Sequence, residues 1–72
     1  MLEETELAVL TVDLPDYGLK AGDVGTVVLV HGRKGYEVEF MTLDGEMVAV
    51  TSLRAAEVRS ISSREVAHVR SI

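Results

Sequence analysis

The stretch Gly22-Asp23-Val24-Gly25-Thr26-Val27-Val28-Leu29-Val30 decides the fold of this chain. Its glycine-bracketed turn leads into a β-branched run, which is typical of a strand. The segment Tyr36-Glu37-Val38-Glu39-Phe40 then alternates apolar with acidic residues, so its aromatic and valine side chains share one face of a second strand. A tight type I′ turn at Asp44-Gly45 leads into a third run. Together these segments predict a meander of short antiparallel strands.

The rest of the chain extends this meander. The segment Asp13-Leu14-Pro15-Asp16-Tyr17-Gly18 forms a loop because proline cannot donate to a β-ladder, and Leu14 and Leu19 are expected to cover one end of the core. Gly25 lies just inside a strand and predicts a bulge or a close backbone approach. With a 3₁₀ turn at residues 52–56, the order of elements predicts an all-β fold, a small five-stranded SH3-like barrel over residues 1–61. The strands are expected at residues 7–12, 27–30, 36–40, 47–51 and 57–61.

Residues 62–72 form a C-terminal extension for which two structures are open. Ser62-x-x-Glu65 matches a capping box, and Val66 and Val69 would then share a helix face. In a strand, alternate residues from position 66 onward would share a face instead. The β-branched content favours an extra strand. We expect this extension to pack on its own barrel or on a neighbouring subunit.

The chain is short and has few means of stabilising itself. Its 72 residues are near the lower limit for a domain that folds alone, and none of them is a cysteine. The histidines His31 and His68 lie far apart, so we expect no metal site and no cofactor. Association with a second copy or another protein is the remaining route to extra stability, and a 47% hydrophobic composition supplies apolar surface for it.

The net charge of −5 is unevenly distributed. Residues 1–46 hold ten acidic against three basic residues, whereas residues 47–72 hold two acidic against four basic residues. An acidic body repels phosphates, so we expect no binding to nucleic acid. The acidic residues 1–6 do not match a signal peptide, and no apolar run approaches the ~20 residues of a membrane span. These features predict a soluble cytoplasmic protein without membrane contact.

Several of these motifs occur together in a known family. The combination of Asp13-Leu14-Pro15, Gly22-Asp23-x-Gly25-Thr26-Val27 and Tyr36-Glu37-Val38-Glu39-Phe40 resembles a family of small bacterial proteins known only as a domain of unknown function. The match runs over most of the chain and includes Arg64-Glu65-Val66-Ala67-His68-Val69-Arg70. The resemblance implies a small β-barrel, and it brings no known activity and no known functional residues.

Two more distant similarities concern the segment from Gly22 to Val30. It looks like the glycine-turn-strand element of KOW-type ribosomal and transcription-factor barrels, but the basic residues of that group are absent here. It also looks like the C-terminal barrel of the nitrile hydratase β subunit. That likeness implies a protein-packing module without a catalytic residue.

The candidate site residues point to protein contacts, and we expect no enzymatic activity because no nucleophile stands at motif spacing from a histidine. Glu37 and Glu39 are acidic neighbours on one strand face, although a solvated face would have the same pattern. Asp13 and Asp16 can present carboxylates or simply form the turn. His68 can act as a pH-sensitive contact or as a plain edge residue. The residues expected to contact a partner are Asp13, Asp16, Tyr17, Val28, Val30, Glu37, Glu39, Val66, His68 and Val69.

Two hypotheses of function follow from these features. The leading one is a non-enzymatic protein–protein interaction module that self-associates, since one strand is apolar on both faces and the tail is rich in valine. The alternative is an acidic inhibitor or antitoxin-like partner of a basic protein encoded nearby, since an acidic face steers association with a basic one.

Overall fold

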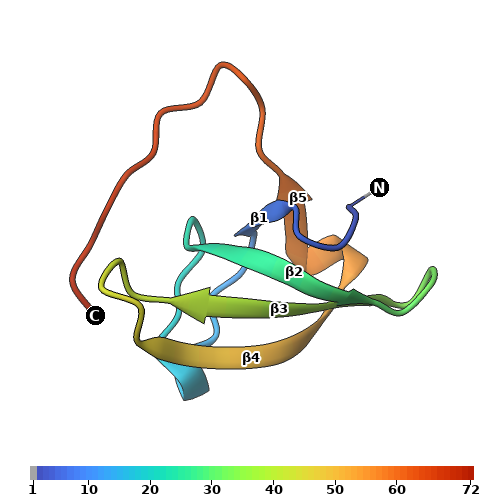
Figure 1. Cartoon of the computed structure of the whole chain (residues 1–72), viewed down its shortest axis with the longest axis horizontal. Coiled ribbons are helices and arrows are strands. Elements are labelled where there is room, and N and C mark those ends of the chain that lie inside the picture. Colours follow the sequence, from blue (N-terminus) through green and yellow to red (C-terminus); the bar gives the residue numbers. More distant parts are fainter. Residues whose placement is uncertain (1) are drawn as a thin grey trace.

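A computed structural model describes residues 2–72, and its regular structure is one antiparallel sheet (Figure 1). Two short 3₁₀ turns flank the strands: η1 (Pro15–Tyr17) follows the first strand and η2 (Ala55–Glu57) precedes the last. The predicted all-β class and the helical turn before the last strand are therefore confirmed. Within residues 2–72 the sheet has five strands in the order β4-β3-β2-β1-β5, which are β1 (Leu7–Leu10), β2 (Val24–Val30), β3 (Gly35–Met41), β4 (Met47–Arg54) and β5 (Val58–Ser60).

Strand β3 has the inside–outside alternation that its sequence predicts. The side chains of Tyr36, Val38 and Phe40 are 6%, 0% and 2% exposed, so they form one wall of the core. Glu37 and Glu39 lie between them and point to the opposite, partly exposed face. The pattern of period two thus sets which face of the sheet is apolar and buried.

Strand β4 is longer than predicted and continues to Arg54. The sequence assigns residues 52–56 to a helical turn, but Leu53 instead pairs with Tyr36 of β3 and is 4% exposed. Burial of this leucine against the core extends the strand and delays the 3₁₀ turn to Ala55–Glu57. Strand β1 ends earlier than expected, at Leu10.

The sheet wraps around one core although it is open. Leu53 of β4 and Val58 of β5 belong to the same buried cluster, while β4 and β5 form the two opposite edges of the sheet. Register shifts at Val28 in the β2–β3 pair and next to Phe40 in the β3–β4 pair increase the local twist. Among residues 2–72 no ladder joins β4 to β5, so their backbone edges stay unpaired while their side chains share a core.

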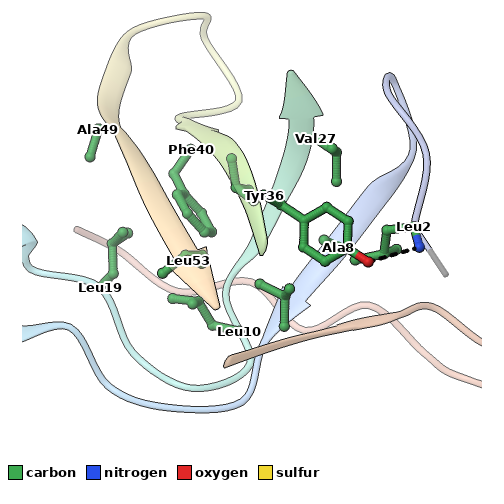
Figure 2. Packing of buried hydrophobic residues seen from close by; sticks show 11 residues of the cluster. Leu2, Ala8, Leu10, Leu19, Val27, Tyr36, Phe40, Ala49 and Leu53 are labelled. Atoms are coloured by element: carbon green, nitrogen blue, oxygen red, sulfur yellow. Dashed lines mark hydrogen bonds between the residues drawn. The ribbon is translucent and has the colours of Figure 1, made fainter. Parts of the chain in front are cut away.

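The N-terminal segment also contributes to the core. Leu2 is 5% exposed, and its backbone N–H donates to the hydroxyl oxygen of Tyr36 over 3.3 Å (Figure 2). This bond gives the phenol a polar partner at the rim of an apolar cluster. The acidic character of residues 1–6 gave no indication that a leucine among them is buried.

The loop between β1 and β2 folds back on itself as the sequence predicts. Leu14 and Leu19 form an isolated antiparallel bridge, and Leu19 is 3% exposed. Pro15 opens the 3₁₀ turn between them, and Gly18 ends it with a φ of 70°, in the left-handed region. The two leucines therefore close one end of the core.

The turn between β3 and β4 is not the predicted type I′ turn. Within residues 2–72 Thr5 is the one non-glycine residue with a positive φ, so Asp44 lacks the positive φ that a type I′ turn requires. Gly45 has a φ of 91° and donates its N–H to the carbonyl of Thr42. The Thr42 hydroxyl donates to the Asp44 carboxylate and so favours this three-residue loop.

The C-terminal extension forms neither of the two expected elements. Residues 61–72 contain one turn near Ser63 and no strand or helix, and the expected extra strand is a wrong prediction for this chain. The capping pattern forms only in part: Glu65 accepts a hydrogen bond from the Ser62 N–H over 2.7 Å, but the helix does not continue. The β-branched residues that follow this turn favour an extended chain. They form no strand because this segment does not lie beside an edge strand with which it could pair.

At Gly25 two strands approach each other closely, as the sequence predicts. A Cβ atom built on Gly25 would lie 2.6 Å from Val38 Cγ1 and 2.8 Å from the carbonyl oxygen of Glu39. The carbonyl belongs to the rigid ladder of β3 and cannot move aside. Only a residue without a side chain fits here.

We expect the substitution Gly25→Ala to destabilise the fold by about 1–3 kcal/mol, because it overpacks a filled core against backbone. Denaturant unfolding followed by circular dichroism measures this loss. The control is Thr26→Ser on the same strand, which should change the unfolding free energy by less than about 1 kcal/mol. Equal stability of Gly25→Ala and the parent chain would contradict the close approach.

Candidate interaction surface

The outer face of the sheet, the side opposite the core, carries the predicted acidic pair. Glu39 lies between Thr26 of β2 and Val50 of β4, and Thr26 lies beside Leu7 of β1. Glu37 pairs with Leu29 in the next register position. The prediction that these two carboxylates share a face is therefore correct.

Apolar side chains surround these carboxylates. Strand register places their side chains on this face or at its ends, and each is 41–59% exposed. The register places Leu7 opposite Thr26, Leu29 opposite Glu37 and Val50 opposite Glu39, so apolar and polar side chains alternate across this face, and Met41 lies opposite Met47. The members of this outer apolar surface are Leu7, Val24, Val28, Leu29, Met41, Met47 and Val50.

Glu37 already has a partner within the chain. Its carboxylate lies 2.8 Å from His31 Nε2, and the side chains of His31 and Glu37 are 43% and 32% exposed. His31 follows β2 in the hairpin that leads to β3, so a local contact joins the hairpin to the sheet. This bond makes Glu37 less available to a partner than Glu39.

The two valines predicted to form a two-faced strand differ in position. The register shift in β2 leaves Val28 unpaired between Val27 and Leu29, and Val28 is 43% exposed. Val30 instead is partly buried and packs against the core. Val28 therefore belongs to the outer surface, whereas Val30 belongs to the interior.

The loop between β1 and β2 holds three of the predicted site residues, and one of them stabilises the loop itself. Asp13 accepts a hydrogen bond from the Ala21 N–H over 2.9 Å and so holds the end of the loop in place. Asp16 and Tyr17 lie in η1, and Tyr17 is 48% exposed. All three residues are exposed to solvent.

The C-terminal extension is held to the domain by two arginine–carboxylate pairs. Arg59 of β5 donates two hydrogen bonds to the carboxylate of Glu65, at 2.8 and 2.7 Å. Arg70 donates to both carboxylate oxygens of Asp23, at 2.8 and 2.5 Å, and to the carbonyl of Gly18 at 2.9 Å. Both pairs have the two-pronged geometry of strong charge-assisted bonds.

These pairs hold the extension without burying its apolar side chains. Val66 and Val69 are 94% and 73% exposed, and Ile72 is 65% exposed. His68 is exposed as well. In Figure 1 the extension leaves β5, arches away from the sheet and returns to the end where β2 begins. The predicted tail contacts therefore point to solvent in the single chain.

The arginine pairs change the acidity of their carboxylates. Hydrogen bonds from Arg59, together with the Ser62 N–H, lower the pKa of Glu65 to about 2 from its usual 4.5. The hydrogen bonds from Arg70 lower the pKa of Asp23, against an opposing effect of its burial. Both carboxylates are thus ionised wherever the protein is folded near neutral pH.

The structure brings one group of the predicted residues together, on the outer face of the sheet. Val28, Glu37 and Glu39 share the outer face, while Tyr17 lies next to the Gly18 carbonyl that Arg70 binds. The Arg70–Asp23 pair was not foreseen, since 47 positions separate its members and no local pattern links them.

Two shallow hollows lie near the unpaired edges of the sheet. One, of about 300 Å³, is lined by Leu2, Tyr36, Ala55, Val58, Arg59 and Ser60. Among residues 2–72, no three histidine, cysteine or acidic side chains lie close enough together to hold a metal ion. In the same part of the chain no helix has the length and apolarity needed to cross a membrane.

We expect the Glu65 carboxyl to titrate with a midpoint near pH 2 in the folded chain. Because the folded pKa is lower than the usual value, the Arg59–Glu65 contact stabilises fully above pH 4.5 and is lost as the pH falls through about 2. Carbon-detected NMR of the glutamate carboxyls measures the midpoint. Arg59→Ala should return it towards 4.5, whereas the control Arg64→Ala should leave it near 2.

We expect Arg70→Ala to release the end of the extension, because it removes the bonds to Asp23 and Gly18. Heteronuclear NOE values for residues 69–72 should fall. The unfolding free energy should change by less than about 1 kcal/mol, since partly exposed ion pairs contribute little. Unchanged NOE values would show that other contacts hold this end of the chain.

Comparisons with known proteins add a family to this description. No curated protein and no solved structure matches the chain. One family model matches residues 4–60, which include all five strands and leave out the whole C-terminal extension, so the resemblance stated for residues 64–70 lies outside the match. By this match the chain belongs to the family described as "Domain of unknown function (DUF4926)".

Proposed function

We propose that this chain is a non-enzymatic protein–protein interaction module that binds a second copy of itself. One observation carries the proposal: the outer apolar surface has seven large exposed hydrophobic side chains on four strands of a very small domain. Thirteen large hydrophobic side chains are exposed among residues 2–72, against twelve hydrophobic residues in the core. Scattered apolar side chains are ordinary on a protein surface, but this many on one face of a domain of this size favour an interaction site.

Internal charge pairing favours this proposal over binding to a basic partner. Glu37, Glu65 and Asp23 are each bound by a basic side chain of the same chain, and Glu57 accepts a bond from the Arg54 N–H. Glu6, Asp13 and Asp44 also accept hydrogen bonds, so seven of the twelve acidic side chains are engaged within the chain. An acidic surface built to bind a basic protein would keep its carboxylates available.

Light scattering coupled to size-exclusion chromatography tests the proposal. We expect the full chain to elute at micromolar concentration with twice the mass of one chain, and to do so at both low and high salt. Burial of apolar surface persists in high salt, whereas screening weakens charge-driven association. A mass of one chain at every concentration would contradict self-association.

The same measurement shows whether the C-terminal extension contributes to the dimer contact. The double variant Val66→Ser, Val69→Ser keeps both arginine pairs and removes the two most exposed tail valines. A loss of dimer in this variant alone would place the contact on the extension. We expect the dimer to persist, because the outer apolar surface carries the proposal.

A further inference from the structure

The two edges of the sheet differ in how well they are protected from pairing with another chain. Strand β5 has three residues, and its central residue Arg59 is held by Glu65 of the extension. Short, charged edges resist pairing with a further strand. The edge at β5 therefore has the features that keep a strand from associating.

The edge at β4 has none of these features. β4 has eight residues, and residues 47–53 contain no charged side chain and no proline. Its ladder with β3 is regular from Ala49 to Arg54, and the one register shift of this pair lies at the other end, near Met47. The strand thus offers a long row of unpaired backbone N–H and C=O groups in an apolar setting, which is a template for another strand.

We infer that β4 pairs antiparallel with β4 of a second copy around a two-fold axis, so that both sheets join into one. This inference rests on the proposed self-association and places the contact at the β4 edge of the outer apolar surface, where Met47 and Val50 lie. A two-fold interface brings each residue against its own counterpart or against a symmetric partner. Any charge near the axis would meet its own copy, and β4 carries no charge there.

The charges at the two ends of β4 fix the register. Glu46 directly precedes the strand, and Arg54 ends it. Antiparallel pairing with Val50 on the two-fold axis places Glu46 of one copy opposite Arg54 of the other, because both lie four positions from Val50. The Arg54 side chain is 82% exposed, and its contact with Glu57 is long, at 3.5 Å, so the guanidinium is accessible to a partner.

The substitution Val50→Lys tests the position of the axis. Val50 is 44% exposed and lies beside Glu39, so a lysine there gains an attractive neighbour and the single domain stays folded. In the dimer two lysines would meet at the axis. We expect the dissociation constant of the dimer to increase about tenfold or more. Analytical ultracentrifugation at a series of protein concentrations measures this constant.

The matched control is Ile61→Lys, which places the same charge next to the opposite edge at a side chain that is 41% exposed. It should leave the dimer intact. Leu7→Lys probes the outer surface away from β4. If the Leu7→Lys or Ile61→Lys variant is monomeric while the Val50→Lys variant is still a dimer, pairing through β4 is overturned. Self-association itself would still hold in that case. A parent chain that stays monomeric would overturn both proposals.

A charge exchange tests the register. Glu46→Arg should weaken the dimer severalfold, since each copy then sets an arginine against Arg54 of the other. The double variant Glu46→Arg, Arg54→Glu should restore it. A double variant that remains as weak as Glu46→Arg would refute the register. Hydrogen exchange adds a backbone readout: alternate amides of β4 should become protected as the concentration rises, and unchanged exchange would refute strand pairing.

Discussion

Val27 of β2 packs against Val38 of β3, and both side chains are fully buried. This pair sets the register of the central hairpin, since a slip by one residue would turn Glu37 and Glu39 into the core. Gly25 makes the register possible, because any side chain there would strike the backbone of β3. With the register fixed, Glu39 is brought beside Val50, and the composition of the outer surface follows.

The sequence was most informative where the signal is local. The alternation at residues 36–40 and the glycine at position 25 depend on neighbours in the chain, and the structure agrees with both. The length of β4 was missed because Ser52 and Arg54 are polar, while the buried Leu53 between them continues the strand. Polar residues at alternate positions fit the exposed face of a strand as well as a turn. Only the pairing with the neighbouring strand decides between the two.

The candidate site was less predictable, for two physical reasons. Arg70 and Asp23 meet only after folding brings the last residues to the start of β2, and such a contact leaves no periodicity in the sequence. The exposure of Val66 and Val69 could not be inferred either, since β-branched residues favour a strand only where an edge is present to pair with. In this chain the nearer edge, β5, is three residues long and occupied at its centre by an ion pair.

Charge explains why association would use β4. Two copies with a net charge of −5 each repel one another, and salt screens this repulsion only beyond about 8 Å at physiological ionic strength. Close contact must then occur where the acidity is lowest. Most acidic residues lie in positions 1–46, whereas β4 opens the part of the chain in which basic residues outnumber acidic ones. An interface centred on Val50 brings two uncharged segments together. It also places Glu46 of one copy against Arg54 of the other, and this attraction at the rim opposes the repulsion between the two domains.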